Sequence, residues 1–141
     1  MTNSKNLRKS FKIISIIAIV WNVLGVASYF FHVYMSEDAI AKLPEAEQIL
    51  YQNIPTWKTV AFFIATVSGL LGSILLFLKK KIALPVLTLS LIGILVSFYY
   101  DFFKTKLIEI YGNGSIIFPL IVVLIGIFLV WYTKKSHTLL T

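Results

Sequence analysis

Four long apolar runs limit the folds that this chain can adopt. They cover residues 12–34, 57–78, 82–100 and 115–132, and each is close to the ~20 residues that a helix needs to cross a bilayer. Hydrophobic residues make up 58% of the 141 residues and charged residues only 13%, about half the charged share of a typical soluble domain. We therefore predict an all-α membrane protein, a single domain over residues 1–141 that folds as a bundle of four transmembrane helices.

The charged residues differ between the connections, and this difference predicts the orientation of the helices. The two terminal segments and the turn at residues 79–81 hold nine basic residues and no acid, namely Lys5, Arg8, Lys9, Lys12, Lys79, Lys80, Lys81, Lys134 and Lys135. All six acids lie in the loops 35–56 and 101–114. Because Lys- and Arg-rich loops stay in the cytoplasm, we expect both termini and the turn there, and both loops in the periplasm, for a multi-pass protein of a bacterial inner membrane. The basic excess then reflects topology and attraction to anionic lipid, and it does not indicate a nucleic-acid partner.

Small and hydroxyl-bearing residues recur at seven-residue intervals in every predicted span. On one face of the first span these residues are Ser15, Ala18, Asn22, Gly25, Tyr29 and His32. The triplets in the other spans are Thr59, Thr66 and Ser73, then Ala83, Ser90 and Ser97, then Pro119, Gly126 and Thr133. We expect four packing glycines, Gly69, Gly72, Gly93 and Gly126, to let helix backbones approach closely. A seven-residue period predicts a left-handed bundle.

The loop 35–56 carries a helix-start signal. Pro44 precedes Glu45 and Glu47, which places a proline at the first turn and acids near the positive end of a helix dipole. Apolar residues on both sides of Pro44 give the segment one apolar face. We predict a short helix on the membrane surface over the mouth of the bundle; an ordinary solvated connection is the alternative.

Asn22, near the middle of the first span, is the main candidate for a binding site. A side-chain amide at this depth has no water and needs a partner within the protein. The functional interpretation is a polar anchor for a solute or a partner helix, with Thr66, Ser68 and Ser90 at a similar depth. The other interpretation is a hydrogen bond between helices, worth on average about 0.6 kcal/mol. Trp21 beside it either stacks on a ligand or fills a gap in the bundle.

Two further groups of polar residues lie near the loop ends of the predicted spans. Tyr29 and His32 are one helical turn apart, and His32 is a candidate for pH sensing or for contact with interfacial water. Asp101 lies near Lys104, and we expect either an entrance or a surface ion pair of little energetic value.

The sequence carries no recognisable catalytic or metal-binding group. It has no cysteine, its two histidines are His32 and His137, and no charged residue lies deep in a predicted span. A proton relay, a metal cluster and a nucleophilic triad all need such residues at suitable spacings. We therefore expect no enzyme activity, no metal and no cofactor.

Several short motifs resemble a family of small four-span bacterial inner-membrane proteins that is sometimes labelled "sugar transporter". They are Trp21-Asn22-x-x-Gly25, Leu43-Pro44-Glu45, Tyr51, Pro55-x-Trp57, Gly69-x-x-Gly72 and the lysine turn. The resemblance implies the four-span fold and the inner-membrane location. It matches no established carrier motif.

The sequence leaves three functions to compare. The favoured one is a non-catalytic accessory or structural subunit. It would use the helix faces that carry these small and polar residues to form a homo-oligomer or to bind a larger membrane protein. The second is a small homodimeric carrier of a neutral, sugar-like solute, with a pathway lined by Trp21, Asn22, Thr66 and Ser90. The third, a membrane enzyme, has the least support. Fold alone does not decide among them.

Overall fold

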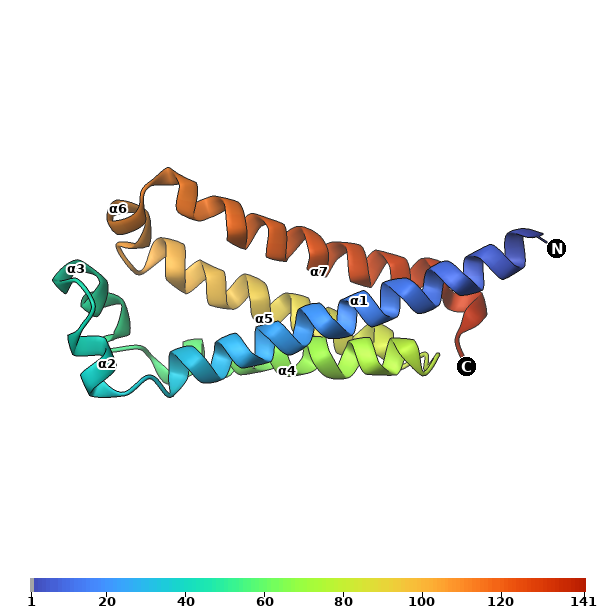
Figure 1. The fold of residues 1–141 in the computed structure, drawn as a ribbon, viewed down its shortest axis with the longest axis horizontal. Coiled ribbons are helices and arrows are strands. Elements are labelled where there is room, and N and C mark those ends of the chain that lie inside the picture. The colour runs from blue at the N-terminus through green and yellow to red at the C-terminus, as the bar shows by residue number, and fades with distance from the viewer. Residues whose placement is uncertain (1) are drawn as a thin grey trace.

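The computed structural model describes residues 2–141, with side chains from Lys5 onward. All of its regular elements in this range are helical (Figure 1). In chain order they are α1 (Thr2–Val33), α2 (Glu37–Ala41), α3 (Glu45–Gln48), η1 (Ile49–Tyr51), α4 (Thr56–Phe77), α5 (Ala83–Phe103), α6 (Leu107–Tyr111), η2 (Asn113–Ile116), α7 (Ile117–Lys135) and η3 (His137–Leu139). Four of them, α1, α4, α5 and α7, are long and apolar enough to span a membrane. The prediction of an all-helical chain with four helices long and apolar enough to span a membrane is confirmed.

The long helices run side by side, and their connections gather at two opposite ends (Figure 1). Both termini and the α4–α5 turn lie at one end, which we call the basic end. The helices α2, α3 and α6 lie at the other, which we call the loop end. Two boundaries differ from the sequence prediction. α1 begins at Thr2 because its basic start contains no proline or glycine to stop a helix, and α5 continues to Phe103, which brings Asp101 into the helix.

Close contact between the backbones of α4 and α5 forms the centre of the fold. A methyl group at Gly93 would lie 2.8 Å from the Ala65 nitrogen and 2.9 Å from the Ala61 oxygen. One at Gly72 would lie 2.6 Å from the side chain of Leu87. Both glycines are buried. The two helices therefore pack backbone to backbone, in the way that small residues allow within a membrane.

The outer helices pack on opposite members of this pair. α1 packs on α4, and α7 packs on α5. At the first contact, a methyl group at Gly69 would overlap the side-chain oxygen of Asn22. At the second, one at Gly126 would lie 3.1 Å from the flexible end of Leu91. α1 and α7 approach each other near the basic end and separate toward the loop end (Figure 1).

Four hydroxyl groups of the seven-residue repeats are buried and bonded to backbone. Ser15, Ser73 and Thr133 each donate to the carbonyl four residues earlier in their own helix. Ser90 instead donates across the interface to the Ala65 oxygen at 2.6 Å. These bonds satisfy the hydroxyls where lipid offers no partner, and the Ser90 bond also ties α5 to α4.

The C-terminal tail, residues 136–141, closes the basic end. Leu140 is buried in a cluster with Phe11, Leu76 and Ala83. The Thr141 nitrogen donates to the Lys79 oxygen at 2.7 Å, and the Lys81 nitrogen donates to the Thr141 oxygen at 3.1 Å. The tail therefore joins the start of α1 to the α4–α5 turn, a role that its sequence does not predict.

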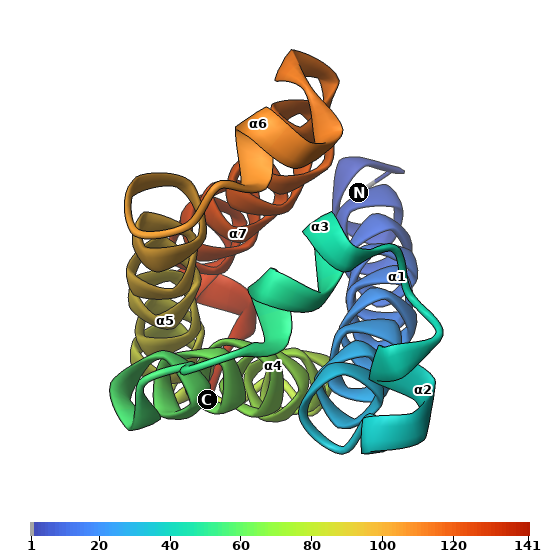
Figure 2. The same ribbon diagram turned by 90° about the vertical axis from the view of Figure 1, so that its left-hand side faces the viewer.

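Short helices cover the loop end. α2 begins after Ser36, whose hydroxyl accepts a hydrogen bond from the Ala39 nitrogen. α3 begins directly after Pro44, where the sequence predicts a helix start. Seen from this end, α3 and the residues after it lie across the middle of the bundle (Figure 2).

The α4–α5 contact predicts an unequal response to two Gly→Ala substitutions. Gly93→Ala should lower the free energy of unfolding in mixed micelles by about 1–3 kcal/mol, because the methyl group meets backbone that cannot move aside. Gly25→Ala is the matched control, since its methyl group would lie 3.8 Å from Thr66, an ordinary contact. Equal stability of the two variants would contradict the packing described here.

Candidate functional site

Asn22 bonds to α4 through its amide nitrogen. That nitrogen donates to the Ser73 hydroxyl at 3.0 Å and to the Ala18 oxygen of its own helix at 2.8 Å. Ser73 in turn donates to the Gly69 oxygen at 2.8 Å. The side chain is thus held between α1 and α4, in the arrangement of an interhelical hydrogen bond.

A small cavity lies beside Asn22 and is bounded by all four long helices. Its volume is about 20 Å³, which is enough for roughly one water molecule. The lining residues are Trp21, Asn22, Gly69, Leu87, Ser90, Ile94, Val122, Ile125, Gly126 and Leu129. Ligand pockets usually measure about 300–1,000 Å³, so the cavity in this conformation does not accommodate a sugar.

The other residues predicted near Asn22 take different positions. Trp21 lines the cavity, and its ring centre lies 6.3 Å from that of Phe118 on α7. Thr66 donates to the Phe62 and Phe63 oxygens of its own helix. Ser68 is half-buried on α4 and is not among the residues that line the cavity. The structure therefore brings Trp21, Asn22 and Ser90 together, but neither Thr66 nor Ser68.

An ion pair near the loop end joins α4 to α5. The Lys58 ammonium lies 3.1 Å from the Asp101 carboxylate and donates to the Ser97 hydroxyl at 2.6 Å. It also lies 4.9 Å from the centre of the Phe62 ring. The Lys58 side chain is 10% exposed and that of Asp101 28%, which makes this a largely buried pair.

Asp101 pairs with Lys58 and not with Lys104, so the prediction of an Asp101–Lys104 ion pair is wrong. Lys104 is exposed and follows the last residue of α5. Lys58 and Asp101 lie at nearly equal distances along the chain from the lysine turn, so the hairpin places them opposite each other. Ser97 and Asp101, four residues apart, share one face of α5. These two spacings could have identified the ion pair from the sequence.

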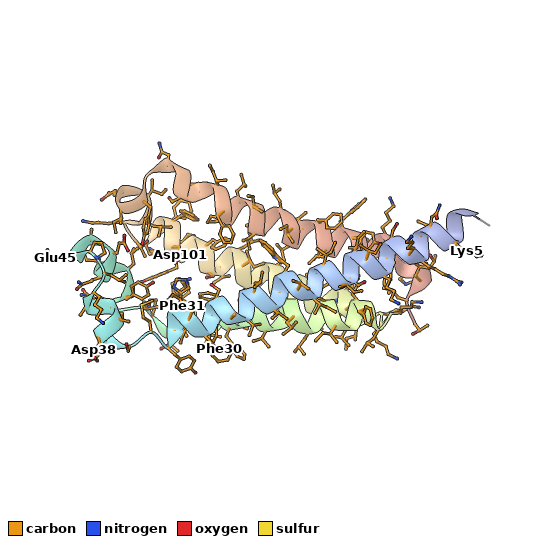
Figure 3. The ribbon with its side chains drawn as sticks, viewed as in Figure 1. Lys5, Phe30, Phe31, Asp38, Glu45 and Asp101 are labelled. Atoms are coloured by element: carbon orange, nitrogen blue, oxygen red, sulfur yellow. The ribbon has the colours of Figure 1, made fainter. Side chains whose placement is uncertain are left out.

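Aromatic residues continue the cluster from the ion pair to α1 and the first loop. Tyr29 packs edge-on against Phe62, with ring centres 5.3 Å apart, and the His32 ring lies 6.2 Å from Phe62. His32 Nδ1 is 3.2 Å from the Tyr51 hydroxyl in η1. The cluster of Tyr29, His32, Tyr51, Lys58, Phe62, Ser97 and Asp101 therefore links α1, the first loop, α4 and α5; we call it the loop-end cluster (Asp101 is labelled in Figure 3).

The side chains of the loop-end cluster hold α1, the first loop, α4 and α5 together. The Lys58 ammonium is surrounded by a carboxylate, a hydroxyl and an aromatic face. Burial, and then the Glu47 carboxylate, raise the pKa of Tyr51 and of Tyr111, so both phenols stay neutral at pH 7. Among the described residues, no three His, Asp or Glu side chains gather where they could hold a metal ion.

Comparisons of the chain with protein-family models, with curated proteins and with solved structures find no match. The resemblance to small four-span inner-membrane proteins therefore stays a prediction.

The buried ion pair predicts strong coupling between its two members. Lys58→Met leaves the Asp101 carboxylate without its cation, and it should lower the free energy of unfolding by about 3 kcal/mol. The double variant Lys58→Met with Asp101→Leu should recover most of this loss, because two apolar side chains leave no buried charge without a partner. Denaturant titration of the wild type, both single variants and the double variant gives the four free energies of unfolding of a double-mutant cycle. Strictly additive losses would contradict the pairing.

Proposed function

We propose that the chain is a non-enzymatic accessory subunit of a bacterial inner membrane, and that it binds a partner membrane protein along the open side between α1 and α7. The observation that carries this proposal is the exposure of α7. In an apolar 18-residue stretch of the span that contains α7, only 6% of the residues are buried, compared with 39% in the corresponding stretch of α4. Of its nineteen residues, Leu129 and Thr133 alone are buried.

The face of α1 on this open side is small and polar. Trp21, Gly25, Ser28 and His32 follow one another at steps of four, three and four residues, which places them on one face. The Trp21–Phe118 contact directs this face toward α7. Ser28 is exposed, and a methyl group at Gly25 would meet only Thr66, at 3.8 Å; His32, at the loop end of this face, contacts Tyr51 and Phe62.

A partner helix suits this face better than lipid does. Acyl chains offer no hydrogen bond to the Ser28 hydroxyl, and they gain nothing from a glycine, whereas a helix packs closely on small residues and bonds to polar ones. The partner is either a second copy of the chain or a larger membrane protein. No nucleic acid, metal or cofactor forms part of this proposal.

The proposal includes the orientation of the chain. The nine basic residues of the basic end favour a cytoplasmic location for both termini and for the α4–α5 turn. The loop end, with all six acids, then faces the periplasm. The seven-residue spacing of the seams supports left-handed packing of the helices.

Photo-crosslinking tests the proposed binding side directly. A photoreactive side chain at position 28 should give a discrete protein adduct in native membranes, because this position faces the partner. The matched control is position 27, where Ala27 is also exposed but points about 100° away around the helix; it should give lipid adducts only. Adducts of equal yield at both positions, or at neither, would overturn the proposal.

The carrier hypothesis predicts a different result, and the cavity at Asn22 is the observation that relates to it. Four helices converge there with two polar side chains, but a solute enters only if the helices separate. We expect purified protein in liposomes to take up no labelled sugar. We expect Asn22→Leu to cost only about the 0.6 kcal/mol of one interhelical hydrogen bond. Sugar uptake that Asn22→Leu abolishes without unfolding the protein would favour the carrier.

A further inference from the structure

The basic end combines exposed lysines with adjacent apolar surface. Lys79, Lys80 and Lys81 are all exposed in the α4–α5 turn. Leu78 and Ile82, on either side of them, are more than half exposed. Charge therefore meets an apolar surface at the point where a membrane-spanning hairpin leaves the hydrocarbon core.

The tail holds this turn in one conformation. Lys79 adopts a left-handed backbone, with φ 59°, and its nitrogen and that of Lys80 donate back to α4 carbonyls, the pattern that ends many helices. The Lys79 oxygen accepts from the Thr141 nitrogen, and the Lys81 nitrogen donates to the Thr141 oxygen. Burial of Leu140 against Phe11 and Leu76 fixes the tail itself.

Cations from two other segments lie at the same end. α7 ends in Lys134 and Lys135, and the Lys135 ammonium lies 4.9 Å from the centre of the Trp131 ring. The start of α1 adds exposed Lys9 and Lys12; Lys5, also in this part of α1, is labelled in Figure 3. The ion pair described within residues 5–141, Lys58–Asp101, lies at the opposite end.

We propose that the basic end is a binding site for the headgroup of an anionic phospholipid, with the tail-held lysine turn at its centre. The phosphate contacts Lys79–Lys81, and the acyl chains lie along Leu78 and Ile82. A free phosphate ion would use the lysines alone, whereas a phospholipid also covers the exposed apolar residues beside them. Clusters of Lys at a membrane surface attract anionic lipid in this way.

Native mass spectrometry of the full chain with two lipids tests this site. Phosphatidylglycerol and phosphatidylcholine with identical acyl chains are supplied in equal amounts, and wild type should retain the anionic lipid preferentially. Lys79→Gln with Lys80→Gln and Lys81→Gln should lower that preference on the order of a hundredfold, since each surface lysine contributes about 1 kcal/mol. The matched control is Lys42→Gln with Lys104→Gln and Lys106→Gln, the same charge change at exposed lysines of the loop end, and it should keep the preference.

Two further measurements distinguish a lipid site formed by the tail-held turn from a general attraction by net positive charge. Leu140→Gln keeps every lysine but removes the apolar anchor of the tail, and it should weaken the preference for phosphatidylglycerol. Inorganic phosphate at millimolar concentration should not displace the bound lipid. Equal retention of both lipids, equal loss in both triple variants, an unchanged preference in Leu140→Gln, or displacement by phosphate would each overturn the proposal.

Discussion

The structure depends on one constraint: α4 and α5 touch backbone to backbone, with Gly93 against Ala61 and Ala65. Lipid gives no hydrophobic reward for bringing two helices together, so close packing and hydrogen bonds must supply the attraction. Small residues at the crossing provide the packing, and the Ser90–Ala65 bond adds a polar contact. The hairpin then offers one side to α1 and the other to α7.

Different interactions fix the two ends of the hairpin. At the loop end, the Lys58–Asp101 pair joins α4 to α5 directly. At the basic end, the tail joins the turn to the start of α1 through Leu140 and Thr141. The cavity at Asn22, between these ends, has a volume of about 20 Å³. We therefore propose partner binding at the α1–α7 side and lipid binding at the lysine turn, and not transport.

The sequence predicted the four spans and their number, since hydropathy and the length of a bilayer crossing decide both. It did not identify the partner of Asn22. A side chain on a helix leans toward the helix N-terminus, which for α1 is the basic end, and Asn22 meets Ser73, which lies two turns from Thr66 toward that end. The sequence does not reveal the Lys58–Asp101 pair because Lys58 lies in the first turn of its span, where a lysine side chain can also extend to water. The tail was missed because six residues without periodicity carry no packing signal.

The close approach of α4 and α5 can be measured directly in a bilayer. In solid-state NMR of labelled protein in liposomes, the structure predicts a strong carbon–carbon correlation between Gly93 and Ala65, since a methyl group on Gly93 would lie 3.1 Å from the Ala65 Cα. A spectrum that resolves both residues, shows their contacts within each helix and lacks this cross-peak would contradict the account.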